Sequence, residues 1–385
     1  MTIEIPFHSA YLDAIRQKII VFDGAMGTSL QKMNLTAEQY GGERTSGCND
    51  FLVISYPAAV EAVHRSYLEV GVDVIETCTF RANRLTLAEY GLQDRTREIN
   101  LAAARLARKV ADEFTQTTGQ KRFVAGSIGP SGKLPSMNDP ELSNITFNEL
   151  AEIFQQQAEA LIVGGVDLLL IETSQDILEV KAAVAGLNSA FEVLGRRLPI
   201  QAQVTLDTTG RMLLGTDISA VHAILEGLRI DAIGLNCSTG PEHMRQAVQY
   251  LGQHSSLPIS CIPNAGLPLN IDGQAVYPMQ PEPFANDLAE FVQHDHVAIV
   301  GGCCGTTPAH MARLVEAVKF LKPSRVEVQR GAFLSSSVQA VAMHQEPRPF
   351  LIGERLNTQG SAKFKKIVLA EDFESALGIA QQQVD

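Results

Sequence analysis

A pattern of eight short apolar runs, each followed by a longer segment with helical periodicity, constrains the fold of this chain more than any other feature. The runs are rich in Val, Ile and Leu and end in small or polar residues. They end near Asp23, Glu76, Ser127, Glu172, Asp207, Cys237, Asn264 and Cys303. Because apolar strands that alternate with helices form parallel sheets covered by helices, the pattern predicts an α/β fold.

The number of these units favours a closed (β/α)8 barrel, the TIM barrel. The first βα turn, DGAMGTSL, lacks the G-x-G-x-x-G fingerprint of a dinucleotide-binding sheet. An open, doubly wound sheet remains the structural alternative. Two segments, 58–71 and 147–165, each place apolar residues on one helical face. These residues are Val60, Val63, Tyr67, Leu68 and Val70 in the first segment, and Leu150, Ile153, Phe154, Ala158 and Leu161 in the second.

The repeating pattern stops near residue 323, so residues 1–323 are predicted to form the barrel. Residues 324–348, which include SSS and EPRP, are expected to be a linker. A strand, a turn and a helix are then expected in 349–385. Since one βα unit cannot bury both faces of its strand, we predict that 349–385 is the N-terminal fragment of a second domain, an incomplete second barrel.

Composition and charge exclude several classes of protein. A net charge of −12, with 6% aromatic residues and no Trp, disfavours nucleic acid as a partner. The N-terminus has no leader pattern, and no run reaches the roughly 20 apolar residues of a membrane span. We therefore expect a cytoplasmic protein without a membrane partner, whose six cysteines are thiols, metal ligands or core residues rather than disulfides.

Three of the cysteines stand at the ends of predicted strands. Cys237 ends the sixth run, and Cys303 and Cys304 follow the eighth. A barrel brings the carboxyl ends of its strands to one rim, so the three thiols can converge. Three thiolates suit Zn²⁺ and leave a fourth coordination position open. The residues therefore favour a zinc site.

Adjacent strand residues point to opposite faces, so Cys303 and Cys304 can share a metal only if the backbone turns. Conformational freedom for that turn is expected from the glycines at 301, 302 and 305. Thr306 or Thr307 is expected to cap the next helix, with Pro308 in its first turn. The positive end of that helix would favour thiolates beside it.

Other interpretations of the cysteines remain open. Free cysteines are often simply buried, and Cys261, in the middle of the seventh strand, is expected to be a core residue. Cys78 lies near the rim after the second strand and could compete as a ligand. Cys303 and Cys304 could also form a strained vicinal disulfide.

Carboxylates and backbone N–H groups are predicted at the same rim. Asp23 precedes a glycine-rich turn whose N–H groups could hold a carboxylate, and Glu76 and Glu172 end two strands. With a metal that binds sulfur, this set suits an amino acid that carries a soft donor atom. The alternative is structural, with Asp23 and Glu76 paired with Arg81 or Arg44.

Six motifs in order and spacing resemble the homocysteine S-methyltransferase family, in particular the N-terminal homocysteine-binding domain of cobalamin-dependent methionine synthases. The motifs are DGAMGTSL, IETCTF, LLLIETSQD, GLNCSTGP, PNAGLP and VGGCCGTTPAH. The resemblance covers about residues 10–322. FLIGERLNTQGSAKFKK further resembles the opening strand of the folate-binding, or pterin-binding, barrel that follows in such enzymes.

The resemblance implies roles for individual residues. Cys237, Cys303 and Cys304 would be zinc ligands, and Asn264 would occupy the fourth zinc position when substrate is absent. The homocysteine amino and carboxylate groups would be held at Asp23, Ala25, Met26 and Glu172, with Glu76 as a further candidate. Glu354 and Asn357 match pterin-contacting positions of an incomplete site.

The resemblance also implies an activity. The zinc-bound thiol of homocysteine would take a methyl group from methylcobalamin, carried by another domain or protein, to give methionine; the methyl group would come ultimately from 5-methyltetrahydrofolate. A homocysteine methyltransferase that uses betaine or S-methylmethionine is one alternative. A zinc-binding module without turnover is the other.

Overall fold

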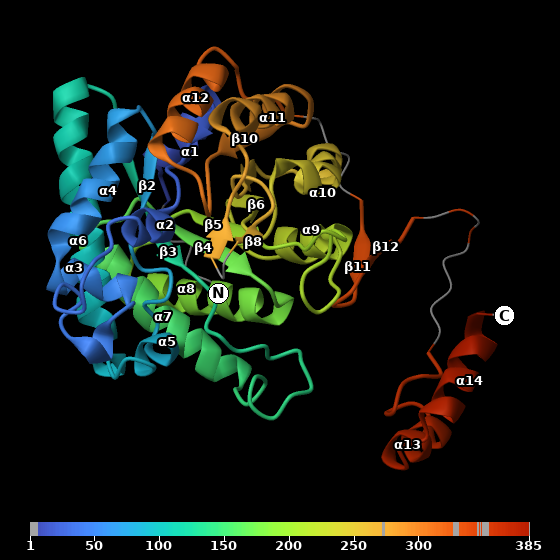
Figure 1. Cartoon of the computed structure of the whole chain (residues 1–385). Coiled ribbons are helices and arrows are strands. Elements are labelled where there is room, and N and C mark those ends of the chain that lie inside the picture. Colours follow the sequence, from blue (N-terminus) through green and yellow to red (C-terminus); the bar gives the residue numbers. More distant parts are fainter. Residues whose placement is uncertain are drawn as a thin grey trace. The chain divides into compact units, whose positions relative to one another are not determined.

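Eight parallel strands form the centre of the computed structural model, which describes residues 7–271, 274–325, 331–344, 346, 348 and 354–384 (Figure 1). The sheet order is β1-β10-β7-β6-β5-β4-β3-β2. These strands are β1 (Ile20–Val21), β2 (Val74–Glu76), β3 (Phe123–Ile128), β4 (Leu168–Ser174), β5 (Ile200–Val204), β6 (Ala232–Asn236), β7 (Ile259–Ile262) and β10 (Val297–Val300).

The sheet closes on itself between β1 and β2. A parallel bridge joins Phe22 to Val74, and the N–H of Asp23 donates to the Val74 carbonyl at 2.9 Å. The prediction of a closed (β/α)8 barrel is therefore confirmed, and the open-sheet alternative is wrong. All eight predicted strands are present at the predicted places.

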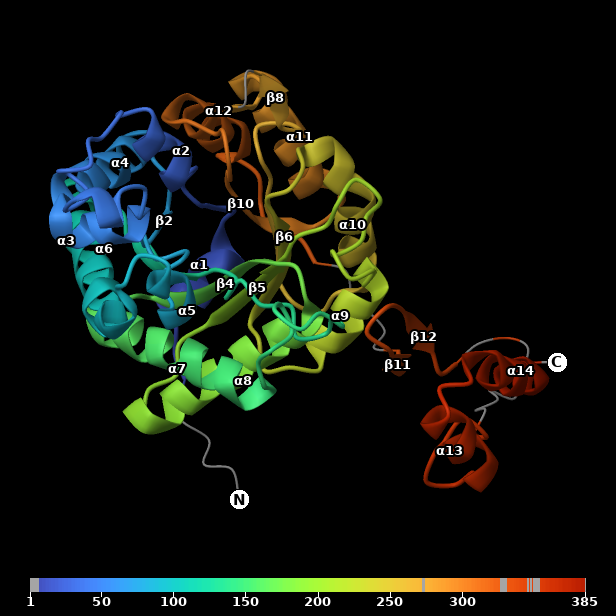
Figure 2. The same cartoon turned by 60° about the horizontal axis from the view of Figure 1, so that its bottom comes forward.

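Helices surround the strands as an outer ring, which Figure 2 shows most clearly. Apart from α1 (Ala10–Gln17), which lies inside this ring, the helices are α2 (Met26–Gln31), α3 (Leu52–Ser55), α4 (Pro57–Glu69), α5 (Arg84–Ala88), α6 (Thr96–Thr118), α7 (Phe147–Gly164), α8 (Ile177–Leu194), α9 (Ile218–Glu226), α10 (Pro241–His254), α11 (Pro281–His294) and α12 (Pro308–Val318). Short 3-10 turns cover Glu43–Thr45, Asn49–Phe51 and Gln93–Arg95. None of the helices in the described part of the chain is both long and apolar enough to cross a bilayer.

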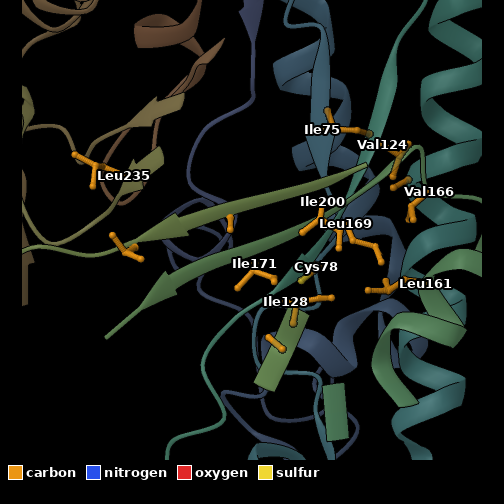
Figure 3. Packing of buried hydrophobic residues seen from close by; sticks show 14 of the residues in the cluster. Ile75, Cys78, Val124, Ile128, Leu161, Val166, Leu169, Ile171, Ile200 and Leu235 are labelled. Atoms are coloured by element: carbon orange, nitrogen blue, oxygen red, sulfur yellow. The ribbon is translucent and has the colours of Figure 1, made fainter. Parts of the chain in front are cut away.

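The main core lies between the outer faces of the strands and the helices. In Figure 3, Val124, Leu169 and Ile200 of neighbouring strands gather near Leu161 of α7. The predicted apolar faces of the two helical segments are buried, with one exception. Val70 is only partly buried, because α4 ends at Glu69 and Val70 is its C-cap.

Helix α1 plugs the amino-terminal end of the barrel. Its Tyr11 is 1% exposed and packs edge-on against the rings of Phe22 and Phe123. The Tyr11 hydroxyl donates to Gln201 Oε1 at 2.6 Å, which satisfies a buried polar group inside the barrel. The amino-terminal end of the barrel is therefore filled with side chains, and we expect the functional site at the carboxyl-terminal rim.

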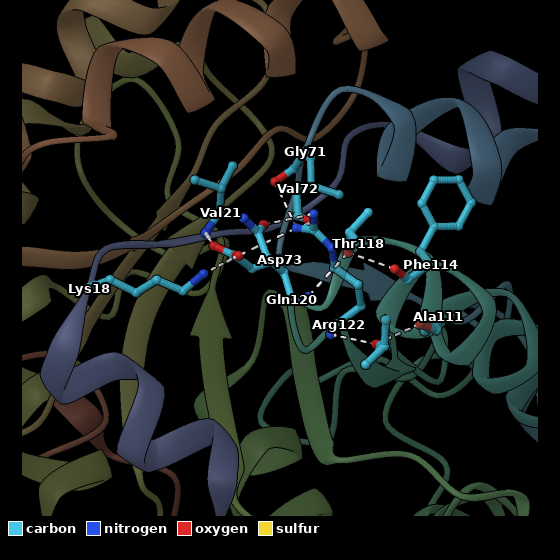
Figure 4. A network of polar contacts seen from close by, with 11 residues as sticks. Lys18, Val21, Gly71, Val72, Asp73, Ala111, Phe114, Thr118, Gln120 and Arg122 are labelled. Atoms are coloured by element: carbon cyan, nitrogen blue, oxygen red, sulfur yellow. Dashed lines mark hydrogen bonds and ion pairs between the residues drawn. The ribbon is translucent and has the colours of Figure 1, made fainter.

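A buried polar network ties together the amino-terminal ends of the first three strands (Figure 4). Asp73 Oδ2 accepts a hydrogen bond from the N–H of Val21 at 3.1 Å, and Oδ1 accepts one from Lys18. Arg122 Nη1 lies 3.6 Å from Asp73 Oδ1 and donates to the carbonyls of Gly71 and Val72. The network thus joins β1 to β2 and β3 near the seam where the barrel closes.

Two short hairpins are additions to the barrel that the sequence pattern did not predict. One consists of β8 (Leu269–Ile271) and β9 (Gln274–Val276), in the loop after β7. The other consists of β11 (Phe333–Ser335) and β12 (Ala340–Ala342), inside the expected linker. The turn of the second hairpin is held by Thr216, whose Oγ1 donates to the Ser337 carbonyl at 2.6 Å.

The described residues fall into two compact units, one within Met1–Arg330 and Ser335–Ala340, the other within Gly331–Leu334 and Val341–Asp385. The second unit contains α13 (Ala362–Leu369) and α14 (Phe373–Val384), and the latter lies where a helix was predicted. The strand predicted near 349–353 lies outside the described residues. The assignment of 349–385 to a second barrel remains a prediction.

Candidate metal centre

Three thiols converge at the carboxyl end of the barrel. Cys237 directly follows β6, and Cys303 and Cys304 follow β10. The Sγ of Cys304 lies 3.9 Å from that of Cys237 and 4.0 Å from that of Cys303, and all three Sγ atoms lie within 4.8 Å of one another. A tetrahedral zinc ion with Zn–S bonds of about 2.3 Å requires S···S distances of about 3.8 Å. The cluster therefore has the spacing of a metal site.

The backbone turns sharply at the thiols. Cys237 has φ +59°, a left-handed conformation that costs free energy in a non-glycine residue. Gly305 has φ +80°, which supplies part of the turn expected after Cys304. Gly301 and Gly302 do not adopt positive φ, so neither supplies a left-handed residue to the turn. They allow close packing instead, since a Cβ on Gly302 would lie 2.4 Å from Thr306 Oγ1.

The end of β7 and the segment after it lie between the two cysteine-bearing loops and bond to both. The N–H of Cys237 donates to the Ile262 carbonyl at 3.1 Å, and that of Cys303 donates to the Pro263 carbonyl at 2.8 Å. This segment contains Asn264, which is 2% exposed. Asn264 Oδ1 has no hydrogen-bond partner among the described residues, so the structure leaves one buried oxygen acceptor available beside the cluster.

The three thiols perturb one another strongly. Hydrogen bonds from Cys237 and Cys303 lower the pKa of Cys304 to about 3, because they stabilise its thiolate. Hydrogen bonds with Cys237 and Cys304, together with burial, raise the pKa of Cys303. Three sulfur atoms this close together are a soft donor set suited to Zn²⁺.

The remaining cysteines are not part of this cluster. The Sγ of Cys78 donates to the Asn49 carbonyl at 3.4 Å, and Cys261 is fully buried against Met244. All six cysteines are free thiols, so the structure contains no vicinal disulfide between Cys303 and Cys304. Among the described residues, the three rim cysteines form the one group with metal-ligand spacing.

Helix α12 begins directly after the paired cysteines, as predicted. Thr307 is its N-cap in a capping box with His310, and Pro308 occupies the first turn. Thr306 has a different role, because its Oγ1 accepts a hydrogen bond from the N–H of Ala25 at 3.2 Å. The helix N-terminus therefore faces the loop that carries the thiols, where its dipole favours negative charge.

Three carboxyl groups lie on the strand ends near the thiols. The N–H of Glu76 donates to Asp23 Oδ2 at 3.1 Å, while Asp23 Oδ1 is buried without a partner among the described residues. The pKa of Glu172 is raised to about 7, by burial first and also by the charge of Cys304, against hydrogen bonds from Ser127 and Asn236. Burial and mutual repulsion also raise the pKa values of Asp23 and Glu76.

The structural alternative for these carboxylates finds no support in the described part of the chain. Arg81 pairs with Glu89 at 2.6 Å, and neither Arg81 nor Arg44 forms an ion pair with Asp23 or Glu76. Asp23 and Glu172 are buried and Glu76 is partly buried beside them. Such carboxyl groups without a cationic partner are costly, which is typical of a site that receives a cation.

Ala25 and Met26, the predicted contacts of the substrate carboxylate, differ in whether their backbone N–H groups are free to donate. The Ala25 N–H is already engaged with Thr306. Met26 is the first residue of α2, where a backbone N–H has no acceptor within the helix. Of the two, Met26 is therefore better placed to donate to an external carboxylate.

Tyr277 is a site residue that the sequence reasoning missed. A Cβ on Gly305 would lie 2.2 Å from Tyr277 Cγ, so the tyrosine packs directly over the cysteine loop. The pKa of Tyr277 is raised by burial and by the charge of Cys304. Its segment is anchored through Met279, whose N–H donates to the Ala265 carbonyl at 3.0 Å. Tyr277 follows an exposed hairpin without a core pattern, so only its proximity in sequence to PNAG could have signalled a role.

The expected pterin-contacting residues lie in the second unit. Glu354 is exposed, and Asn357 Oδ1 accepts a hydrogen bond from the N–H of Gln359 at 2.9 Å. The pterin contacts of Glu354 and Asn357 stay a prediction.

The chain is similar in sequence to known proteins. "Methionine synthase" from Mycobacterium tuberculosis (strain ATCC 25618 / H37Rv) is 40% identical over 372 residues, which are 97% of this chain and 30% of that protein. "Methionine synthase" from Mycobacterium leprae (strain TN) is 40% identical over 377 residues, or 97% of this chain and 31% of that protein. The chain thus spans less than a third of the length of these relatives.

Solved structures support the same fold. The homocysteine methyltransferase MmuM from Escherichia coli matches in its metallated form with a TM-score of 0.63 and 24% identity, over 79% of this chain and 97% of that chain. Its oxidized form matches with a TM-score of 0.63 and 25% identity, over 80% of this chain and 98% of that chain.

A family model described as homocysteine S-methyltransferase matches residues 20–318. The chain belongs to the homocysteine S-methyltransferase family.

Proposed function

We propose that this chain transfers a methyl group to the thiol of homocysteine, giving methionine, and that Zn²⁺ held by Cys237, Cys303 and Cys304 takes part. The observation that carries the proposal is the convergence of three thiols beside three carboxyl groups in a chain of this family. Both ends of homocysteine then have complementary groups, a sulfur-binding metal for the thiol and carboxylates for the ammonium.

The residues fit zinc by chemistry and by spacing. The cysteine Sγ atoms supply three soft ligands at S···S distances of 3.9 and 4.0 Å for the two pairs that include Cys304. Asn264 Oδ1, buried and without a partner in the described part of the chain, suits a fourth position without substrate. When bound, zinc would lower the pKa of a coordinated thiol, so that the substrate sulfur is held as a nucleophilic thiolate at neutral pH.

The protein groups around the thiols orient the amino-acid part of the substrate. Asp23 and Glu172 accept hydrogen bonds from the ammonium, and Glu76 adds negative charge beside them. Met26 donates its N–H to the carboxylate. In this arrangement the substrate sulfur points toward the cysteines and its apolar chain lies between the two sets of groups.

We propose methylcobalamin, carried by another domain or protein, as the methyl donor. The sulfur–carbon bond forms while the carbon–cobalt bond breaks, and its electron pair stays on cobalt, which leaves cob(I)alamin. Support comes from the motif resemblance and from relatives named methionine synthase, which are more than three times as long as the matched region. By the same resemblance, we propose that 349–385 begins a pterin-binding domain in which Glu354 and Asn357 contact the pterin.

Replacement of one ligand tests the metal and the reaction together. Cys303→Ser should lower the zinc content and abolish methionine formation from homocysteine and free methylcobalamin. Cys261→Ser, the same change at a buried thiol outside the cluster, should retain both. Normal zinc and unchanged turnover in Cys303→Ser would contradict the proposal, and zinc binding without turnover in the unaltered chain would indicate a non-catalytic module.

A comparison of methyl donors tests the proposal that methylcobalamin supplies the methyl group. The unaltered chain should form methionine with methylcobalamin and not with betaine or S-methylmethionine. Turnover with either of these donors, but not with methylcobalamin, would contradict the choice of donor and leave the homocysteine site intact.

A further inference from the structure

Asn236 lies between the metal centre and the carboxylate cluster without belonging to either. It is the last residue of β6, it is 0% exposed, and the next residue is Cys237. Its Nδ2 donates to Glu172 Oε2 at 3.1 Å and to Thr173 Oγ1 at 2.9 Å. One side chain thus contacts the end of β4 while its own backbone leads into a cysteine of the metal cluster.

A bulge at the end of β4 makes this contact possible. The pairing of β4 with β5 shifts between Ile171 and Ser174, so that two residues of β4 stand opposite one residue of β5. The second of the two, Thr173, has φ +54°. Its N–H donates to Asn236 Oδ1 at 2.7 Å instead of to a carbonyl of β5.

This hydrogen bond fixes which way the amide of Asn236 faces. A backbone N–H can only donate, so the atom that faces Thr173 N must be the amide oxygen, and the NH₂ group must face Glu172. Ser127 also donates a hydrogen bond to Glu172, through its other oxygen. Glu172 therefore receives a donor on each oxygen and is held as an acceptor.

The backbone of Asn236 is equally constrained. Its carbonyl accepts a hydrogen bond from Thr205 Oγ1 at 2.6 Å. Cys237, with its left-handed φ of +59°, follows directly. Asn236 thus connects two residues in strained conformations. It bonds to Thr173 of β4 through its side chain, and it leads into Cys237 through its backbone.

We infer that Asn236 is a positioning residue that fixes Glu172 relative to Cys237, and so sets the distance between the ammonium site and the metal centre. This inference rests on the proposed function, because it assigns Glu172 to the ammonium of homocysteine. Asn236 touches neither end of the substrate in this account. It determines whether a molecule with a thiol at one end and an ammonium at the other can reach both sites.

Asn236→Asp tests the donor role with almost no change of shape. An aspartate can still accept from Thr173, but it cannot donate to Glu172, and it places a second carboxylate against the first. The measurement is calorimetric binding of homocysteine and of 4-mercaptobutanoate, the same molecule without the amino group, to the zinc-loaded chain. We expect homocysteine to bind about 10- to 100-fold more weakly to the variant. Binding of 4-mercaptobutanoate and the zinc content should be unchanged.

Two further variants complete the test. Asn188→Asp makes the same substitution at a partly buried position of α8, where Nδ2 donates to the Val184 carbonyl, and should leave both affinities unchanged. Asn236→Ala removes the donor without adding a charge and serves if the aspartate variant does not fold. Asn236→Ala should also bind homocysteine more weakly than the unaltered chain does, while its affinity for 4-mercaptobutanoate stays the same.

The outcomes separate this inference from the proposed function. If the unaltered chain with zinc does not bind homocysteine, the proposed function is wrong. If it binds homocysteine and the Asn236 variants keep the full preference for it over 4-mercaptobutanoate, Asn236 is not a positioning residue. Equal weakening of both thiols, or loss of zinc, would also overturn the inference, because it would indicate a general structural role.

Discussion

The surroundings of Asn264 suggest that its side chain binds zinc and gives way to the substrate thiol when homocysteine binds. Its Oδ1 is buried, lies in the segment that bonds to both cysteine loops, and has no partner among the described residues. A buried amide oxygen without a hydrogen bond is costly unless something else binds it. We predict that Asn264→Ala will weaken zinc retention by roughly tenfold in the absence of homocysteine, a size typical of one lost supporting group at a metal site.

The measurement is competition with a chelator, with and without homocysteine. Because the substrate thiol would replace Asn264, saturating homocysteine should bring zinc retention of the variant close to that of the unaltered chain. An equal loss of zinc under both conditions would contradict the exchange of ligands.

At the scale of single residues, the cysteine cluster could be predicted and its surroundings could not. Cys237, Cys303 and Cys304 stand at strand ends, and barrel topology alone brings strand ends together. The contacts of Asn236 depend on a bulge in β4, and those of Tyr277 depend on an exposed hairpin. Neither feature leaves a periodic pattern in the sequence.

At the scale of elements, the loop between β3 and α7 is tied to the start of α8. Ser131 donates to Glu179 through its N–H at 2.8 Å and through its hydroxyl, and Ser136 donates to Asp176, the N-cap of α8. Burial raises the pKa of Glu179 to about 7, against these hydrogen bonds from Ser131. The folded state therefore favours the protonated form of Glu179.

This shift predicts a pH dependence of stability. The folded pKa of Glu179, about 7, exceeds its ordinary value of 4.5, so its stabilising contribution is complete below pH 4.5 and is lost as the pH rises through 7. Glu179→Gln removes the ionisation and can still accept from Ser131. Relative to the unaltered chain, the variant should gain about 1–3 kcal/mol between pH 5 and pH 8, measured by urea unfolding. Parallel stability curves for the two proteins would contradict the prediction.

Most elements were predictable because each strand and helix carries its own apolar pattern, and α4 and α7 bury the predicted faces. The hairpin of β8 and β9 was not predictable, because its described residues are exposed and show no pattern of buried apolar positions. The different roles of Gly302 and Gly305 were not predictable for a related reason. A glycine that allows close packing and one that allows positive φ look the same in a sequence.

At the scale of the whole barrel, closure depends on the buried network around Asp73 and Arg122, whose side chains are 8% and 5% exposed. We predict that Asp73→Ala will lower the free energy of unfolding by about 3 kcal/mol, because it removes the negative charge that faces buried Arg122 and leaves the Val21 N–H without its acceptor. Asp13→Ala, at an exposed pair with Arg16 on α1, should cost less than about 1 kcal/mol. Equal effects of the two substitutions in urea unfolding would contradict this role for the network.

The closed barrel itself followed from eight repeated units, whereas the seam network could not be anticipated, since Lys18, Asp73 and Arg122 belong to three separate units. The motifs that resemble the homocysteine S-methyltransferase family agree with the family match over residues 20–318.

We propose that three cysteine thiolates hold a zinc ion and that the substrate sulfur takes its fourth position. X-ray absorption at the zinc edge, recorded with and without homocysteine, shows which atoms bind the metal. We expect three sulfur ligands and one oxygen or nitrogen ligand without homocysteine, and four sulfur ligands with it. A coordination shell that homocysteine does not change, or one with fewer than three sulfurs in its absence, would mean that zinc is not held in this way.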